Sequence, residues 1–519
     1  MSRDRVVFAG VLLALAVVGA GLVAGRALSS ATATGTPPPE LTTYASQWPA
    51  FNLNLSNTRD TTASSLNSSN VAHLKAKWKF KLSGAGAFGA FASTPISLGN
   101  TIFLQDLKSN VYALNRTTGK LEWRHRFASS SEGPNGVAYG YGMLFGNTAT
   151  SAFALSPTNG RLLWMRKLTR NGNEGIDMAP TVYDGTVLVS TVPGNAKAFY
   201  AGNGDGIVYG LDAQSGKTKW KFNTISDGAK LWGHPKLNSG GGLWYPPAVD
   251  SAGRVFLAVA NPAPWPGTSE YPNGSSRPGP DLYTDSLVAL DGSTGKLLWY
   301  RQVLRHDLRD YDLQDSPVIG TVTLGGSPTE VVFAAGKMGR VYAFQAANGK
   351  RVWTKAVGEH VHDLGSLPAR KKTLVLPGAV GGVETPMAYD GTSLYVPDVN
   401  LGFVYTASTV KPARSGIFSG TGELLALNPA TGSTRWVHRF PTADYGAATV
   451  SNDVVFTSTF NGKVYALDSR SGAVLWSAQA PAGVNGFAAV DGNTVLVGAG
   501  APGPYVKHRS DALVAYSTG

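Results

Sequence analysis

The sequence lacks cysteine altogether in 519 residues, and only 15% of its residues are charged. The absence of cysteine excludes disulfides, thiolate metal sites, a lipid-modified cysteine and covalent attachment of a c-type haem. The sequence also lacks a Ser-His-Asp ordering, a phosphate-binding loop and a dinucleotide fingerprint. The formal net charge is +12, but the densest basic cluster is only Arg370-Lys371-Lys372. We therefore expect no nucleic-acid partner.

One long apolar run stands near the N-terminus. Residues 6–25 are apolar, follow Arg3 and Arg5, and precede Arg26. This length can span a bilayer, and the positive charges favour a cytoplasmic N-terminus. A cleaved signal peptide is the alternative, with a small-residue cleavage site at residues 31–33. We predict that 1–33 is a membrane anchor or signal, that 34–45 is a Pro-containing linker, and that the rest is extracytoplasmic and contacts the membrane only through this segment.

A short phrase recurs seven times along the remaining chain. A β-like run ends in a small residue, a polar turn closes on Gly, and a Trp follows four residues after that Gly. The Gly and Trp pairs are Gly119 and Trp123, Gly160 and Trp164, Gly216 and Trp220, Gly295 and Trp299, Gly349 and Trp353, Gly432 and Trp436, and Gly472 and Trp476. A turn that ends on Gly between two strands predicts a hairpin, because Gly readily adopts a positive φ. The regular recurrence of the Trp residues predicts that they dock neighbouring repeats against one another.

The two ends of this repeat region complete an eighth copy. Residues 513–519 match the first half of the repeat and end where its Trp-bearing strand should begin. Residues 74–80, with Trp78, match the missing second half. Pairing of the two ends closes a ring and removes exposed sheet edges. The sequence therefore predicts an all-β fold, an eight-bladed β-propeller over residues 46–519 that is closed by its N- and C-terminal strands.

Two segments outside the repeat pattern carry a more specific signal. They read Asn261-Pro-Ala-Pro-Trp265 and His306-Asp-Leu-Arg-Asp310-Tyr-Asp312. The opening Trp48-Pro-Ala-Phe-Asn, followed by Asn57-Thr-Arg59, adds to them. With these motifs the chain, from about residue 46 onward, resembles the quinoprotein alcohol dehydrogenases, which depend on pyrroloquinoline quinone (PQQ). That family is also built as an eight-bladed propeller with a Trp-bearing repeat.

The resemblance implies a role for five residues of this chain. Asp310 would be the general base and a ligand of a Ca²⁺-like cation, Asn261 a second ligand, Trp244 the ring that stacks on the quinone, Lys337 the cation beside its carbonyls, and Asn400 a further cofactor contact. Such a set would oxidise an alcohol, polyol or sugar hydroxyl, with PQQ and Ca²⁺ or another hard cation as cofactors. Because the chain lacks a haem attachment site, electrons would leave to a separate acceptor.

Other positions depart from the family pattern. The second metal carboxylate, a Glu, has no counterpart in residues 189–195, and Asn135 stands where the family has an Arg that holds the cofactor. The family's vicinal cysteines are absent. A non-catalytic cell-envelope propeller that binds protein partners therefore remains the alternative function. For the single residues, local roles also stay open: Asp310 as a turn-capping carboxylate, Asn261 as a turn residue and Lys337 as a solvated cation.

Overall fold

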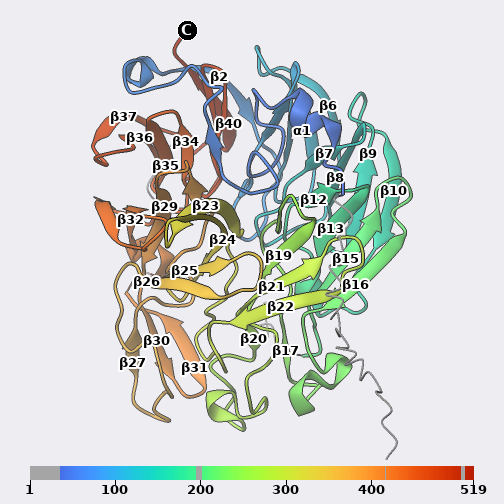
Figure 1. Cartoon of the computed structure of the whole chain (residues 1–519), viewed down its shortest axis with the longest axis vertical. Helices are drawn as coiled ribbons and strands as arrows, with labels where there is room; N and C mark the ends of the chain where they lie inside the picture. The colour runs from blue at the N-terminus through green and yellow to red at the C-terminus, as the bar shows by residue number, and fades with distance from the viewer. Residues whose placement is uncertain (1–34, 195–201, 415, 504–505, 507–508) are drawn as a thin grey trace, which may run out of the picture.

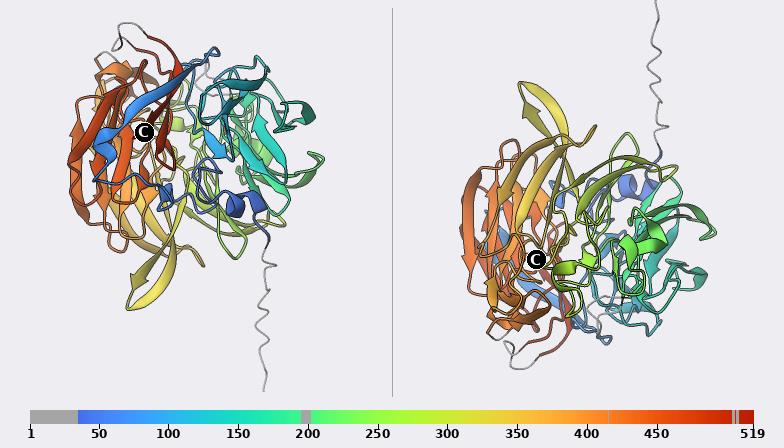
Figure 2. Two further views of the ribbon diagram at one scale, coloured as in Figure 1. Left: turned by 90° about the horizontal axis from the view of Figure 1, so that it is seen from above. Right: turned by 90° about the horizontal axis from the view of Figure 1, so that it is seen from below.

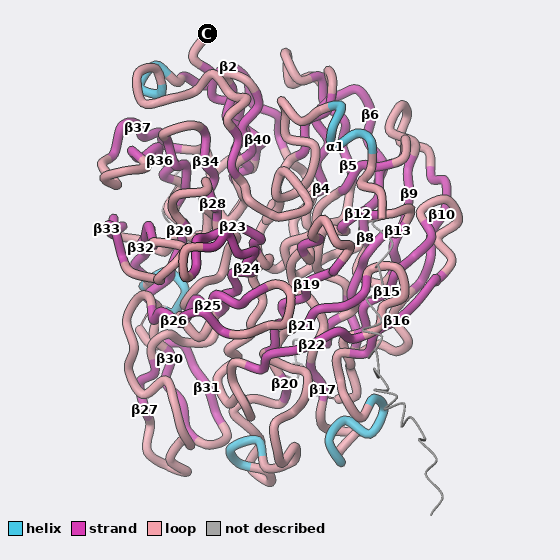
Figure 3. Tube along the Cα trace, in the orientation of Figure 1, coloured by secondary structure: helices cyan, strands magenta, loops and turns pink. Residues whose placement is uncertain are grey.

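The computed structural model describes residues 35–194, 202–414, 416–503, 506 and 509–519. The predicted membrane anchor or signal lies outside these residues. Strands make up most of the regular structure (Figure 3), so the all-β prediction is confirmed. The helical elements are the α-helix α1 (Pro39–Thr43) and the short 3₁₀ turns η1 (Val71–His73), η3 (Gly228–Gly233), η4 (Pro272–Gly274) and η5 (Gly416–Ser419). None of the helices in the described part of the chain is long and apolar enough to cross a membrane.

The strands of the described residues form eight sheets of at least four strands, which follow one another around the molecule in chain order (Figure 1). The first four sheets are β3 (Ile96–Leu98), β4 (Thr101–Gln105), β5 (Val111–Asn115) and β6 (Leu121–His125); β7 (Ala138–Gly140), β8 (Met143–Asn147), β9 (Ser151–Leu155) and β10 (Leu162–Lys167); β12 (Thr181–Tyr183), β13 (Thr186–Ser190), β15 (Ile207–Asp212) and β16 (Thr218–Asn223); and β18 (Ala248–Val249), β19 (Arg254–Ala258), β21 (Ser286–Asp291) and β22 (Leu297–Gln302).

The other four sheets continue in the same way. They are β23 (Val318–Leu324), β24 (Ser327–Gly336), β25 (Arg340–Gln345) and β26 (Arg351–Ala356); β28 (Ala388–Tyr389), β29 (Leu394–Asn400), β32 (Thr421–Leu427) and β33 (Thr434–Phe440); β34 (Thr449–Ser451), β35 (Val454–Ser458), β36 (Lys463–Asp468) and β37 (Val474–Gln479), with β1 (Asp60–Thr61) added in parallel to β34; and β38 (Ala489–Asp491), β39 (Thr494–Ala499), β40 (Ala512–Ser517) and β2 (Lys75–Lys81). Loops between them form three small sheets: β11 (Glu174–Gly175) with β14 (Val192–Pro193), β17 (Ser239–Gly240) with β20 (Pro262–Ala263), and β27 (Thr373–Val375) with β30 (Phe403–Thr406) and β31 (Thr409–Pro412).

The repeat Trp residues join each sheet to the next. Trp123, on the last strand of its sheet, donates a hydrogen bond from Nε1 to the carbonyl of Pro157 at 2.8 Å, and its ring lies against Gly160. A Cβ on Gly160 would come within 2.5 Å of that ring, and its φ is +69°, so the position requires Gly for two reasons. The same indole-to-carbonyl bond is made by Trp164, Trp220, Trp299, Trp353, Trp436 and Trp476.

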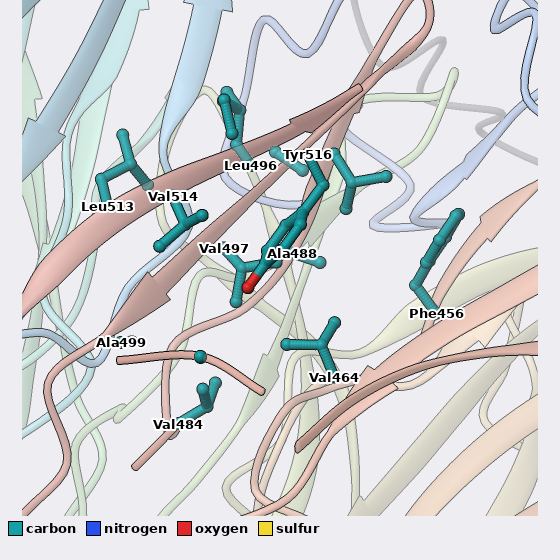
Figure 4. Packing of buried hydrophobic residues seen from close by; sticks show 14 of the residues in the cluster. Phe456, Val464, Val484, Ala488, Leu496, Val497, Ala499, Leu513, Val514 and Tyr516 are labelled. Atoms are coloured by element: carbon teal, nitrogen blue, oxygen red, sulfur yellow. The ribbon is translucent and has the colours of Figure 1, made fainter. Parts of the chain in front are cut away.

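The two ends of the repeat region meet as strands of one sheet. Strand β2 pairs with β40 in antiparallel register, so that Lys75 lies opposite Ser517. Figure 2 shows the blue N-terminal strand among the red C-terminal ones. Side chains of β40, including Leu513 and Val514, pack with Leu496 of β39 in the core beside this sheet (Figure 4).

An N-terminal segment before β2 binds the innermost strands at the centre of the molecule. Its backbone carbonyls accept hydrogen bonds from β3, β18, β23, β28 and β34, which belong to five sheets. The pairs are Trp48 with Ser97, Leu55 with Val249, Ser56 with Ile319, Thr58 with Tyr389 and Arg59 with Val450. The buried side chain of Arg59 extends from this segment. The segment therefore holds together sheets from both halves of the chain.

Candidate active site

Four of the five predicted site residues line one cavity of about 370 Å³. Trp244 and Asn261 come from the loops on either side of β18 and β19, Asp310 from the loop between β22 and β23, and Lys337 from the turn after β24. Asp310 has a φ of +68°, which turns the loop sharply at this residue. Loops of the β18–β22 and β23–β26 sheets, and the connections next to these sheets, thus meet at one place.

Polar contacts hold three of these side chains together. Asn261 Nδ2 donates to Asp310 Oδ1 at 2.9 Å, and Lys337 Nζ donates to Asp310 Oδ2 at 2.8 Å. Lys337 Nζ also lies 2.7 Å from Asp312 Oδ2, and the backbone N–H of Asn261 donates to Asp312 Oδ1 at 2.8 Å. Asp312 does not line the cavity, so it contacts Lys337 and Asn261 from the side away from the cavity.

Burial and neighbouring charges shift the pKa values of Asp310 and Lys337. Burial raises the pKa of the Asp310 carboxyl well above its ordinary value, although Lys337 acts in the opposite direction. Burial alone would lower the pKa of Lys337, but Asp310 and Asp312 raise it well above its ordinary value, so the ammonium stays protonated. A carboxylate with a raised pKa is a stronger base, which suits proton abstraction.

Eight aromatic rings from the described part of the chain line the cavity. They are Phe88, Trp244, Tyr245, Trp265, Phe403, Tyr445, Phe460 and Phe487. Flat apolar faces of this kind bind a planar ring by stacking and dispersion. Trp244 is one of these rings, and its stacking on a quinone stays a prediction.

Sequence analysis missed Glu384, which also lines the cavity. Gln314 Nε2 donates to Glu384 Oε2 at 2.7 Å, whereas Oε1 is buried and has no hydrogen-bond partner in the described part of the chain. Burial raises its pKa to about 7, so this acid is half-protonated near neutral pH. The available signal was a single acidic residue directly after the apolar, Gly-rich segment 378–383.

Asn400 is not brought together with the other four residues. It lies at the end of β29, does not line the cavity, and its Oδ1 accepts a hydrogen bond from the backbone N–H of Glu359 at 2.6 Å. This contact ties β29 to the loop after β26. The structure thus gives Asn400 a local structural contact rather than a place at the predicted cofactor wall.

Two residues before Asn400, Asp398 is buried, and neither of its carboxylate oxygens has a hydrogen-bond partner in the described ranges. Burial, with Glu423, Asp444 and Glu359 nearby, raises its pKa to about 8. The folded protein therefore keeps a proton that the unfolded chain releases near pH 4. The resulting stability is fully present below that pH and is lost as the pH rises through about 8.

Asp398→Asn is accordingly expected to flatten the pH dependence of stability. Between pH 5.5 and 8.5 the unaltered protein should lose more free energy of unfolding than the variant, by on the order of 3 kcal/mol at most. Urea unfolding at both pH values measures this difference. Asp291→Asn, at the half-buried end of β21, is the control and should show the same loss of stability over this pH range as the unaltered protein. An equal loss of free energy of unfolding in Asp398→Asn and in the unaltered protein would contradict the raised pKa of Asp398.

The described residues do not fit a hard divalent cation. Ca²⁺ takes six to eight oxygen ligands, whereas the predicted ligands here are only Asn261 and Asp310, and Lys337 already contacts the carboxylate. No cluster of three or more His, Asp or Glu side chains among the described residues is arranged to hold a metal ion. The quinone ring fits the aromatic walls better, with Lys337 as the one Lys or Arg that lines the described cavity.

Comparison with known proteins adds to this geometry. The family model described as "Glucose/ethanol/alcohol dehydrogenase, beta-propeller domain" matches residues 158–360, which contain Trp244, Asn261, Asp310 and Lys337. The polyvinylalcohol dehydrogenase of a Pseudomonas species is 28% identical over 85% of this chain and 68% of its own length. The quinoprotein alcohol dehydrogenase PedH of Pseudomonas putida is 25% identical over 81% of this chain and 80% of its own length.

The chain is similar to the PQQ-dependent alcohol dehydrogenase family. The crystal structure of a member of this family, the quinohemoprotein alcohol dehydrogenase of Comamonas testosteroni, has the same fold. Its TM-score is 0.80 at 20% identity, over 94% of this chain and 84% of that one. A second family model, described as "Outer membrane protein assembly factor BamB", matches residues 75–205 and 337–517. That model leaves out Trp244, Asn261 and Asp310.

Proposed function

We propose that the protein is an extracytoplasmic oxidoreductase of the PQQ type that oxidises the hydroxyl group of an alcohol, polyol or sugar. The eight sheets would be the eight blades of a closed propeller, and the cavity would hold both cofactor and substrate. The observation that carries the proposal is the convergence of Asp310, Lys337 and Trp244 on one aromatic cavity. The related enzymes that act on alcohols support the choice of reaction.

Several residues of this chain have separate roles in the proposed oxidation. Asp310 accepts the hydroxyl proton at a carboxylate oxygen, while Asn261 and Lys337 keep that carboxylate in place. The substrate carbon loses its hydrogen with the electron pair and becomes a carbonyl carbon; PQQ, when bound, supplies the quinone that accepts this hydride. The Lys337 ammonium stabilises negative charge that develops nearby. The aromatic walls exclude water and favour a substrate with an apolar chain.

A dye-linked assay tests this proposal. The full chain is incubated with PQQ and offered primary alcohols, polyols, sugars and polyvinyl alcohol, with a phenazine dye in place of the separate electron acceptor. We expect dye reduction that depends on both PQQ and one of these substrates. Dye reduction that is the same without PQQ, or absent with every substrate, would count against an oxidoreductase.

The alternative is a propeller that binds protein partners, and the match to the BamB family model favours it. A binding scaffold needs neither a paired carboxylate in an aromatic cavity nor an acid of raised pKa there. Both features are present, so we place the oxidoreductase first. A loss of dye reduction in Asp310→Asn would separate the two functions, because a scaffold has no such activity to lose.

A further inference from the structure

The Asp310 carboxylate, which lines the cavity, and the Asp312 carboxylate behind it both face Lys337 and Asn261. Asp310 Oδ1 accepts from Asn261 and Oδ2 from Lys337, at 2.9 and 2.8 Å. Asp312 Oδ1 accepts from the backbone of Asn261 at 2.8 Å, and Oδ2 lies 2.7 Å from Lys337 Nζ. Three of these four oxygens accept a hydrogen bond, and Asp312 Oδ2 forms an ion pair with the Lys337 ammonium without one. A metal ion that approached Asp310 Oδ2 would be repelled by the Lys337 ammonium, which already lies 2.8 Å from that oxygen.

The amide of Asn261 is turned so that it does not act with Asp310 as an oxygen ligand. Its Nδ2 faces two acceptors, Asp310 Oδ1 at 2.9 Å and the carbonyl of Pro262 at 3.3 Å. Two acceptors on one side require the nitrogen there, since an oxygen would meet two other oxygens. The amide oxygen consequently points away from Asp310. The two oxygens do not meet at one point as ligands of a cation would.

Close backbone packing fixes the ammonium of Lys337 between the carboxylates. The N–H of Lys337 donates to the carbonyl of Asp312 at 3.1 Å. A Cβ on the preceding Gly336 would lie 1.9 Å from that same carbonyl oxygen, and a Cβ on Gly382 would lie 2.3 Å from the carbonyl of Lys337. The side chain is also only 10% exposed. The backbone of Lys337 is thus closely packed, and the ammonium is held by its contacts with Asp310 and Asp312.

We infer that the Lys337 ammonium takes the place of a divalent cation at Asp310, so that the cavity binds its quinone without a metal ion. The part of this inference that concerns quinone binding rests on the proposed function. The part that concerns the absence of a bound metal ion does not. One ammonium between two carboxylates supplies the positive charge that the site requires. Removal of that charge leaves both carboxylates buried without a cation.

The metal alone provides the first test. Full-length, chelator-treated protein is titrated calorimetrically with Ca²⁺ and then with La³⁺, and its Tm is measured with and without each ion. We expect no saturable heat and no rise in Tm. Saturable binding that Asp310→Asn abolishes would overturn the inference.

Lys337→Met provides a test in the opposite direction. Because it frees two buried carboxylates, we expect this variant to gain a rise in Tm with Ca²⁺ that the unaltered protein lacks. Lys337→Arg keeps the charge and should show no such gain. A gain in Lys337→Arg equal to that in Lys337→Met would contradict the inference. If Lys337→Met does not fold, the titration of the unaltered protein with Ca²⁺ and La³⁺ still decides whether the site binds a metal ion.

PQQ binding separates this inference from the proposed function. Equal affinity for PQQ in chelator and in Ca²⁺ would support the metal-free site, whereas binding only in Ca²⁺ would overturn it. If PQQ bound under neither condition, the proposed function would fail. The titrations with metal alone would still decide on the metal-free site.

Discussion

Asp310→Asn is expected to lower kcat for alcohol oxidation by about 10³-fold. Asparagine has nearly the same shape as aspartate but cannot accept the hydroxyl proton. Lys337 keeps a carboxylate partner in Asp312, at 2.7 Å, so the cavity should retain its form. Steady-state kinetics in the dye-linked assay measure the loss, and PQQ binding to the variant shows whether the cavity is intact.

The matched control for this variant is Asp312→Asn. Asp312 also contacts Lys337 but does not line the cavity, so it cannot reach a substrate. We expect kcat to fall less than about tenfold, through looser positioning of Lys337 and Asn261. An equal fall in kcat in Asp310→Asn and Asp312→Asn would show that the two carboxylates matter for structure only. A variant Asp310→Asn that keeps more than a tenth of the activity would exclude Asp310 as the base.

Arg59→Met is expected to destabilise the fold by roughly 3–5 kcal/mol. The guanidinium is fully buried, and burial lowers its pKa to about 9. It donates six hydrogen bonds, to the carbonyls of Phe51, Ala448 and Ala488 and to the side chains of Asn52, Thr94 and Thr449. Methionine fills part of the space but donates none of these bonds; among the described residues, only the carbonyls of Phe51 and Ala488 keep a further donor, from Trp48 Nε1 and Thr449 Oγ1.

Urea unfolding measures this loss of stability. Arg509→Met is the control, because Arg509 is 33% exposed and pairs at 2.7 Å with Asp511, which is 21% exposed. That change should cost about 1 kcal/mol or less. Losses of similar size in the two variants would contradict a central role for Arg59. Dye reduction should survive in Arg59→Met below its unfolding transition, since Arg59 does not line the cavity.

The repeat made most of the fold predictable from sequence. Each Gly and Trp serves a local need, a positive φ and a docking ring, and such needs leave a regular pattern in the sequence. Pairing of the chain ends was predictable for the same reason: residues 74–80 supply the half-repeat that residues 513–519 lack, and β2 pairs with β40. The binding of the segment from Trp48 to Arg59 to five sheets was not predictable, since its contacts go to backbone groups distant in sequence.

The site was predictable in part. Asn261 and Asp310 lie in motifs specific enough to place them, and the structure brings them to 2.9 Å from one another. Asn400 lies in a strand whose side chains alternate between faces, so its sequence neighbourhood did not reveal which face meets the cavity. Glu384 went unnoticed because a lone acid carries no pattern. Its raised pKa arises from burial by residues distant in sequence.

The most direct test of the proposed function is calorimetric titration of PQQ into the full chain and into Trp244→Ala. Trp244 lines the cavity, and we propose that its indole stacks on the quinone ring. The expected result is saturable binding of one PQQ per chain, weakened at least about tenfold in Trp244→Ala. Binding that Trp244→Ala leaves unchanged would place the cofactor outside this cavity. No binding to the unaltered chain would show that the protein is not a PQQ enzyme.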